Sequence, residues 1–208
     1  MILSKGARKC MRDSTGWCVP SVVLAATLLF VVPTADASSQ QLLQGAREAA
    51  VVGEGHGPRV VYIFFDPNCP YCHLLYGTFQ PLIRRDQLTV HWIPVGIVSP
   101  SSLGKVAAIL DARSPAAALA YNESHYDARD DEGGIDEALP SRKTRALVRR
   151  NDRFLARAPV DAVPTTVMRE ASGRVLVIQG ALSPLALQKA LNTLPASSSL
   201  MGATGGGK

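Results

Sequence analysis

Two cysteines in the segment Asp66–His73, DPNCPYCH, are the residues best suited to carry chemistry. Cys69 and Cys72 have Cys-x-x-Cys spacing, which is about one turn of a helix. If a helix begins at the motif, its unpaired N–H groups and positive end stabilise a thiolate on Cys69. Cys72 is then placed to attack the mixed disulfide that Cys69 forms. The spacing therefore predicts thiol–disulfide exchange, with Cys69 as the nucleophile and Cys72 as the resolving cysteine.

Three other uses of a Cys-x-x-Cys motif compete with exchange chemistry. A structural disulfide across two residues closes so small a loop that it constrains the unfolded chain little. A zinc site needs about four ligands, but there is no second cysteine pair, and the histidines are scattered: His56, His73, His91 and His125. Two inert, buried cysteines are the third alternative, because the motif alone is only moderately specific. A preceding strand, a helix at the motif and an export signal together favour redox chemistry, with no metal and no organic cofactor.

The sequence around the motif predicts the strand and the helix that would position it. The run Arg59–Phe65 is rich in Val, Ile and aromatic residues, as in a central strand that is buried on both faces. Asp66 or Asn68 can cap a helix, and Pro70 suits its first turn. A second strand is predicted over Leu88–Val98. Strand, helix and strand together form the unit of a parallel sheet.

The chain beyond this unit predicts further helices and a hairpin. Apolar residues recur at helical spacing after Ser101, and PAAALAYNESHY is typical of another helix. The basic segment SRKTRALVRRNDRFLARA predicts a solvated helix face, balanced by the acidic loop before it. TTVMRE and RVLVIQG, joined through Ser172 and Gly173, predict a hairpin. Ser183 and Pro184 then suit the start of a last helix.

The two ends of the chain differ in composition from the middle. Residues 1–37 combine a basic start, an apolar run and the small-x-small site Ala35–Ala37, which predicts a cleavable secretory signal. An uncleaved anchor is the alternative, but the apolar run of 14 residues from Val19 to Val32 is short for a bilayer, which takes about 20. We interpret residues 38–58 as a leader helix and linker. Residues 195–208, rich in Ser and Gly, are expected to be a flexible tail.

Length and charge limit the classes of function. Removal of the signal leaves 171 residues, a length that suits one domain with a substantial core. This part of the chain has 18 Lys plus Arg against 15 Asp plus Glu. So small a basic excess argues against a nucleic-acid partner.

Three stretches of the chain resemble the thioredoxin superfamily, and within it the catalytic domain of periplasmic DsbG and DsbC proteins. They are FFDPNCPYCHLLYGTFQPLI, PVGIVSPSSLGKVAAIL and VDAVPTTVMRE. The resemblance implies a thioredoxin-like α/β fold, a central mixed sheet flanked by helices, over residues 59–194. It also implies a helical insertion over about residues 101–158, before the strand that follows a cis-proline. The N-terminal dimerisation domain of that family is not matched, so we expect a catalytic domain alone, as a monomer.

The resemblance also implies site residues around the motif. Pro70 and Tyr71 would support the two cysteines, and Pro164 would be the cis-proline that faces them. Val163, Pro164 and Thr165 would bind an extended segment of substrate. Val163 stands where DsbG-like proteins have Thr and is more like the pattern of the oxidase DsbA, so isomerase activity is the weaker inference.

The route of proton transfer is less well defined by the sequence. Many thioredoxins have an acidic residue six positions before the first cysteine, whereas this chain has Ile63. No buried carboxylate base is evident, so we expect Cys72 to transfer its proton through water or another group. Asp66 suits a cap or turn, and His73 suits an exposed helix surface.

These observations predict a periplasmic thiol:disulfide oxidoreductase that exchanges disulfides with exported, cysteine-containing proteins. By resemblance, its redox partner would be a DsbD-like membrane electron donor or a DsbB-like acceptor. The alternative is a chaperone-like assembly factor of an exported apparatus, which would bind extended polypeptides in the thioredoxin groove with redox activity secondary. Its basic insertion would then serve as a docking face.

Overall fold

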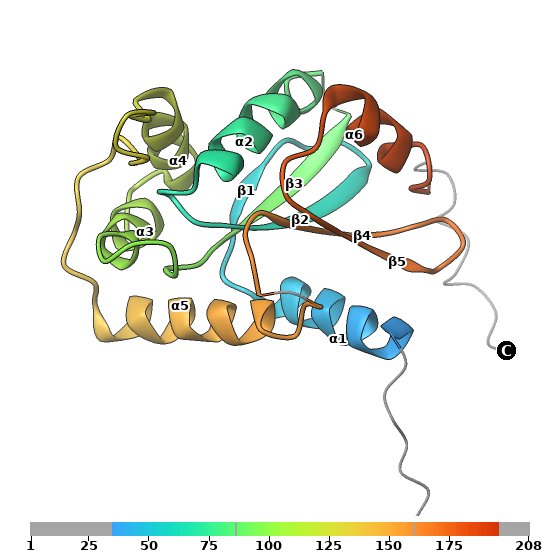
Figure 1. The fold of residues 1–208 in the computed structure, drawn as a ribbon, viewed down its shortest axis with the longest axis horizontal. Helices are drawn as coiled ribbons and strands as arrows, with labels where there is room; N and C mark the ends of the chain where they lie inside the picture. The colour runs from blue at the N-terminus through green and yellow to red at the C-terminus, as the bar shows by residue number, and fades with distance from the viewer. Residues whose placement is uncertain (1–34, 86, 160, 196–208) are drawn as a thin grey trace, which may run out of the picture. The chain divides into compact units, whose positions relative to one another are not determined.

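One mixed five-stranded sheet organises the chain (Figure 1). The computed structural model describes residues 35–85, 87–159 and 161–195. The strand order is β1-β3-β2-β4-β5, with β2 and β3 parallel and the other pairs antiparallel. The strands are β1 Val52–Glu54, β2 Arg59–Phe65, β3 Leu88–Pro94, β4 Thr165–Arg169 and β5 Val175–Gln179. The predicted strand, helix and strand unit and the predicted hairpin are both confirmed.

Helices cover both faces of the sheet (Figure 1). α2 and α6 lie on one face, α1 and α5 lie on the other, and α4 lies beside the start of α2. Helices α3, α4 and α5 form the predicted insertion between β3 and β4. In the part of the chain that the structure describes, no helix is both long and apolar enough to cross a membrane. The helices are α1 Ala35–Glu48, α2 Pro70–Ile83, α3 Ser102–Leu110, α4 Pro115–Ser124, α5 Arg142–Leu155 and α6 Pro184–Leu191.

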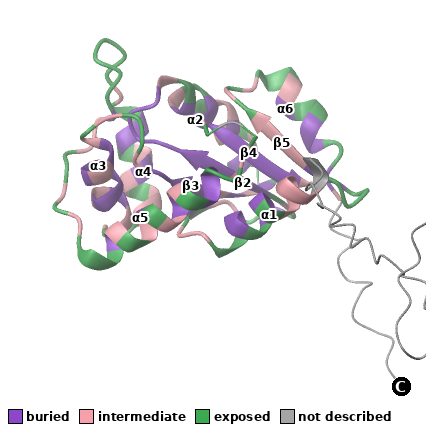
Figure 2. Ribbon diagram, turned by 60° about the horizontal axis from the view of Figure 1, so that its bottom comes forward, coloured by how far each residue is buried: buried purple, intermediate pink, exposed green. Residues whose placement is uncertain are grey.

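The central strand β2 contributes to the cores on both sides of the sheet, as its apolar sequence predicts (Figure 2). Ile63 and Phe65 belong to the same core as Phe79 of α2. Phe64 points to the opposite side and belongs to the core that contains Leu42 of α1. Because side chains alternate between the two faces of a strand, β2 is fixed from both sides. The motif that follows β2 therefore begins at a firmly held point.

The segment interpreted as a leader and linker is an integral part of the fold. α1 ends at Glu48, and β1 pairs antiparallel with β3, with Val52 opposite Trp92. Residues 38–58 lie in the same compact unit as the rest of the described chain, which corrects the predicted domain boundary at residue 59. A strand of three residues is too short to show strand periodicity, so the sequence predicted only a helix followed by a linker here. The predicted signal and tail lie outside the described residues, apart from residues 35–37 and 195.

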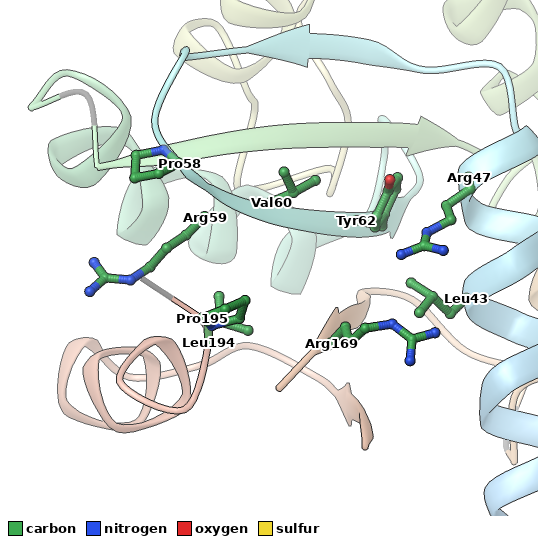
Figure 3. A pocket seen from close by; sticks show the side chains of 9 residues that line it. All are labelled: Leu43, Arg47, Pro58, Arg59, Val60, Tyr62, Arg169, Leu194 and Pro195. Carbon is green, nitrogen blue, oxygen red and sulfur yellow. The ribbon is translucent and has the colours of Figure 1, made fainter. Parts of the chain in front are cut away.

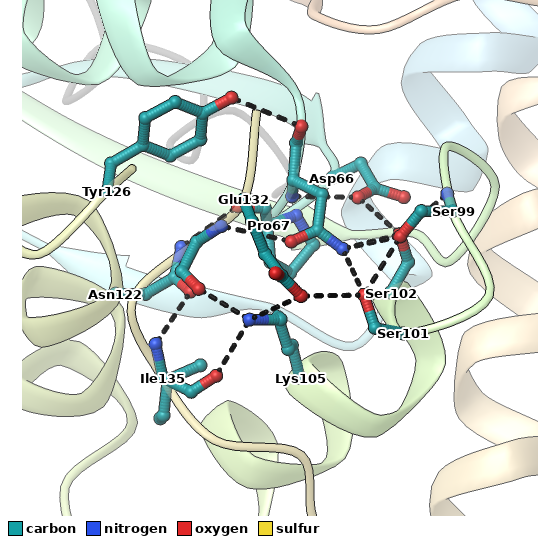
Figure 4. A network of polar contacts seen from close by, with 12 residues as sticks. Asp66, Pro67, Ser99, Ser101, Ser102, Lys105, Asn122, Tyr126, Glu132 and Ile135 are labelled. Atoms are coloured by element: carbon teal, nitrogen blue, oxygen red, sulfur yellow. Dashed lines mark hydrogen bonds and ion pairs between the residues drawn. The ribbon is translucent and has the colours of Figure 1, made fainter. Parts of the chain in front are cut away.

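A buried carboxylate, Asp66, holds the loop between β2 and α2 (Figure 4). Its two oxygens accept four hydrogen bonds, three of which come from the segment that follows β3. The donors are the N–H groups of Asn68, Ile97 and Val98 and the hydroxyl of Ser102. Asp66 therefore braces the loop and does not cap α2. The N-cap residue is Cys69, which corrects the prediction of an Asp66 or Asn68 cap.

Asn68 connects the same loop to the insertion, and its side chain is buried. Nδ2 of Asn68 donates to the hydroxyls of Ser99 at 2.7 Å and Ser101 at 2.9 Å. Oδ1 accepts from the N–H of Gly133 at 3.0 Å. Gly133 has no room for a side chain, because a Cβ there would meet the carbonyl oxygen of Pro67 at 2.5 Å. The insertion therefore packs directly on the backbone that leads into the motif.

Leu42→Ala should destabilise the protein, because Leu42 is fully buried in the core between α1 and the sheet. Such a truncation typically costs about 2–5 kcal/mol. We expect a decrease of that size in the free energy of unfolding, measured by urea denaturation. Leu185→Ala, at a leucine that is 68% exposed, should change it by less than about 0.5 kcal/mol. An equally small effect of Leu42→Ala would instead support the interpretation of residues 38–58 as a leader outside the domain.

Asn68→Ala should loosen the insertion, because it leaves the N–H group of Gly133 without its partner. A buried donor left unpaired costs about 1–3 kcal/mol. We expect that decrease in the free energy of unfolding, together with faster amide hydrogen exchange at Gly133. Asn192→Ala, at the exposed end of α6, is the control and should change neither quantity. Unchanged exchange at Gly133 in Asn68→Ala would show that Asn68 does not hold the insertion.

Candidate active site

The start of α2 places both cysteine side chains. Cys69 is the N-cap residue, with extended backbone angles, and its Sγ accepts a hydrogen bond from the N–H of Cys72 at 3.3 Å. Pro70 follows at the helix start, where its missing N–H leaves no donor unpaired. Both cysteines are free thiols, and both are buried. One sulfur therefore lies at the positive end of the helix, and the other lies one turn inside it.

The two thiols have opposite pKa shifts. The pKa of Cys69 is lowered, chiefly because the thiol of Cys72 donates a hydrogen bond to its sulfur, with further help from the N–H groups of Cys72 and Tyr71. Burial and the charge of Asp66 partly oppose that shift. The pKa of Cys72 is raised well above the usual value, first by burial and then by its interactions with Cys69. The environment therefore favours a thiolate on Cys69 beside a protonated Cys72.

The loop before β4 faces the motif. The peptide bond between Val163 and Pro164 is cis, as the resemblance implies. The thiol of Cys69 lies 3.7 Å from the carbonyl oxygen of Val163, to which it donates. The carbonyl oxygen of Pro164 accepts from the N–H of Gly180 at 2.8 Å, which ties the loop to the end of β5. The structure thus brings together the two cysteines and two of the three residues expected to bind substrate.

The third of these residues, Thr165, differs from the expectation. Its side chain is fully buried, and its hydroxyl donates to the carbonyl oxygen of Ala162 at 2.7 Å. That hydroxyl shapes the loop and is not presented to a substrate. On the other side of the motif, Tyr71 and Leu74 are 61% and 58% exposed. Because they are three residues apart on α2, they lie on one face of the helix, and the sequence alone did not single out Leu74.

The site also contains a buried carboxyl group that the sequence did not reveal. Glu123, near the end of α4, is buried, and its Oε2 lies 3.1 Å from Nδ1 of His73. His73 was expected on an exposed helix surface, but its ring stacks on Tyr126 with the centroids 4.5 Å apart. With Asp66 and Glu123 both buried next to the motif, the expectation of no buried carboxylate was wrong. No local pattern distinguishes Glu123 from a surface glutamate, because its position depends on how the insertion packs.

A further cavity that could hold a ligand lies away from the motif. Among residues 35–85, 87–159 and 161–195, no three His, Cys, Asp or Glu side chains are grouped so that they could hold a metal ion. A cavity of about 210 Å³ is lined by residues of α1, β2 and β4, with three arginines around an apolar floor (Figure 3). These arginines are Arg47, Arg59 and Arg169. Neither cysteine lines this cavity, so it is separate from the candidate active site.

Sequence comparison relates the chain to thiol:disulfide interchange proteins. It is 31% identical over 152 residues to the thiol:disulfide interchange protein DsbG of Pseudomonas aeruginosa, a match that covers 70% of this chain and 57% of that protein. It is 33% identical over 78 residues to the DsbG of Escherichia coli, covering 38% of this chain and 28% of that protein. The chain thus spans little more than half the length of one relative and less than a third of the other.

Solved structures share the fold. A crystal structure of a periplasmic thioredoxin-like protein from Salmonella enterica serovar Typhimurium has a TM-score of 0.58 at 18% identity, covering 73% of this chain and 94% of that one. The catalytic domain of Proteus mirabilis ScsC has a TM-score of 0.60 at 18% identity, covering 74% and 96%. A family model described as a thioredoxin-like domain matches residues 46–195. This chain therefore belongs to the thioredoxin-like domain family, which confirms the fold that the resemblance implied.

Proposed function

We propose that this chain is a periplasmic thiol:disulfide oxidoreductase that exchanges disulfides with exported proteins through Cys69 and Cys72. The observation that carries the proposal is the unequal pair of thiols at the start of α2. One sulfur accepts a hydrogen bond at a helix N-cap and faces a loop with a cis-proline. Neither a structural disulfide nor a pair of inert cysteines requires this arrangement. The DsbG relatives, named as interchange proteins, support the same chemistry.

The geometry suits a two-step exchange. In the reducing direction, the Cys69 thiolate attacks one sulfur of a substrate disulfide, a bond forms between them, and the other substrate sulfur leaves as a thiolate. Cys72 then loses its proton and attacks the sulfur of Cys69, which releases the second substrate sulfur. The substrate gains two electrons and two protons, one from Cys72 and one from solvent. The motif is left as a disulfide, and oxidation of a substrate dithiol is the reverse.

The surroundings of Cys69 suit an extended polypeptide as substrate. Val163 and Pro164 present a loop backbone to the sulfur. Tyr71 and Leu74 add exposed apolar surface on the first turns of α2, where apolar side chains of a partly unfolded protein can pack. The motif must be reset after each turnover. A DsbD-like membrane donor would do this for a reductase, and a DsbB-like acceptor for an oxidase.

Cys69→Ala should abolish turnover, because the remaining thiol of Cys72 is buried and holds its proton. We expect the glutathione-dependent reduction of insulin to fall to the uncatalysed rate, while Leu185→Ala keeps the wild-type rate. Circular dichroism should show that both variants are folded. Wild-type turnover by Cys69→Ala would overturn the proposed function. A Cys69→Ser/Cys72→Ser double variant that still restored assembly of an exported apparatus in cells would favour the assembly-factor alternative.

Cys72→Ala should trap mixed disulfides, because Cys69 can still attack a substrate but nothing resolves the product. We expect covalent adducts with exported proteins on non-reducing gels of periplasmic extracts, and their release by dithiothreitol. Mass spectrometry should place each linkage at Cys69. The Cys69→Ala variant is the matched control and should give no adducts. Adducts of equal abundance in both variants would contradict the assigned roles of the two thiols.

A further inference from the structure

A buried carboxyl group, Glu123, lies beside the motif without a role in the two-step exchange. It comes from α4, within the insertion, and only 4% of its side chain is exposed. Oε2 of Glu123 lies 3.1 Å from Nδ1 of His73. Oε1 accepts from Nδ2 of Asn122 at 3.1 Å, and the same amide donates to the carbonyl oxygen of Pro67 at 3.1 Å. The carboxyl is therefore held between α2 and the loop that leads into Cys69.

His73 links this carboxyl to the cysteines. It directly follows Cys72, and its backbone N–H donates to the carbonyl oxygen of Cys69 at 3.0 Å. Its ring lies against Tyr126, whose hydroxyl donates to the carbonyl oxygen of Asn68 at 3.3 Å. A surface hollow of about 450 Å³ between α2 and α4 is lined by residues that include His73 and Glu123. Solvent can therefore exchange protons with the pair through this hollow.

Other titratable groups surround the pair. α2 contributes Tyr76, whose hydroxyl donates to Oε1 of Glu54 on β1 at 3.1 Å, and whose pKa is raised mainly by burial. Tyr126 also has a raised pKa, again mainly because of burial. Cys69 and Glu54 supply the negative charges that act on Glu123. Burial keeps both tyrosines protonated at neutral pH, which leaves Glu123, His73 and Cys69 as the groups whose pKa shifts bear on the pair.

The pKa shifts of Glu123 and His73 bear on how this pair holds a proton. The pKa of Glu123 is raised to about 8, chiefly by burial; the hydrogen bond from Asn122 opposes the shift, and the charges of Cys69 and Glu54 add to it. Burial lowers the pKa of His73. Both shifts favour the uncharged forms, so near neutral pH the proton at the 3.1 Å contact lies on the carboxyl of Glu123. Asp66 differs, because four donors already occupy its oxygens.

We propose that the Glu123–His73 pair takes up and releases a proton as the Cys69–Cys72 disulfide opens and closes. The inference rests on the proposed function. Reduction of the motif adds two electrons, breaks the bond between the sulfurs, places one proton on Cys72 and leaves a thiolate on Cys69. The new negative charge holds a second proton on the carboxyl of Glu123. When the disulfide forms again, that charge disappears and the carboxyl can release its proton to solvent.

Glu123→Gln tests this inference through the pH dependence of the redox equilibrium. Glutamine has the shape and neutrality of the protonated carboxyl, so the variant copies the low-pH state of the wild type. The equilibrium constant for reduction of the full chain by glutathione is measured for both proteins between pH 6 and pH 9. We expect the ratio of wild type to Glu123→Gln to fall about tenfold over this interval, which corresponds to one pKa unit of coupling. The fall should level off above about pH 8.

Glu48→Gln is the matched control. Glu48 lies on α1, and its side chain is half exposed and paired with Arg150. The ratio of wild type to Glu48→Gln should stay constant across the same interval. A constant ratio for Glu123→Gln, even with a uniform offset, would overturn the inference, because a purely structural role shifts the equilibrium equally at every pH. Failure of the wild type to equilibrate with glutathione would instead overturn the proposed function.

A measurement on the wild type keeps the inference testable if Glu123→Gln does not fold. The infrared difference between reduced and oxidised protein at pH 7 should show the gain of a protonated carboxyl group on reduction. Isotopic labelling of glutamate should shift that band, which separates Glu123 from the nearby Asp66. A difference spectrum without a protonated glutamate band would overturn the inference.

Discussion

The start of α2 must hold two sulfurs in unequal environments, and this constraint accounts for how β2 and the insertion pack around it. A sulfur at the N-cap receives helix N–H groups, which favour its thiolate, whereas a sulfur one turn later faces the sheet and loses its water. Both effects require the first turn of α2 to press on an apolar surface. β2 provides that surface, because Ile63 and Phe65 share a core with Cys72.

The same constraint explains the insertion. A loop that turns from β2 into α2 under such packing has buried polar groups, and each would cost about 1–3 kcal/mol if left unpaired. Asp66 accepts hydrogen bonds from residues that follow β3. Asn68 donates to serines and accepts from the N–H of Gly133, and the carbonyl oxygen of Pro67 accepts from Asn122. Much of the insertion thus completes the site by supplying the hydrogen-bond partners that the motif loop lacks.

Which features the sequence could predict depends on the range of the interactions behind them. β2, the start of α2 and the C-terminal hairpin follow from local patterns: a continuous apolar run, a proline in the first turn and two alternating strands. β1 was not predicted, because a strand of three residues at a sheet edge shows no periodicity. α1 was predicted as a leader outside the domain, although its residues belong to the core of the fold. Asp66 and Glu123 were missed as buried carboxyls because their burial arises from contacts with distant segments.

A carboxyl beneath the motif would have to exchange protons with solvent and also lie in the core against Cys72. Glu123 lies on α4 instead and has to meet only the first of these requirements. An acid at Ile63 would lie in the core that contains Cys72, where an ionised group is costly without a partner. With isoleucine there, the surface under Cys72 stays apolar and keeps the pKa of that thiol high. The carboxyl on α4 instead borders a hollow that reaches solvent and has His73 as its partner. On the proposed mechanism, proton exchange takes place at this hollow, whereas the thiol of Cys72 stays buried in the core that contains Ile63.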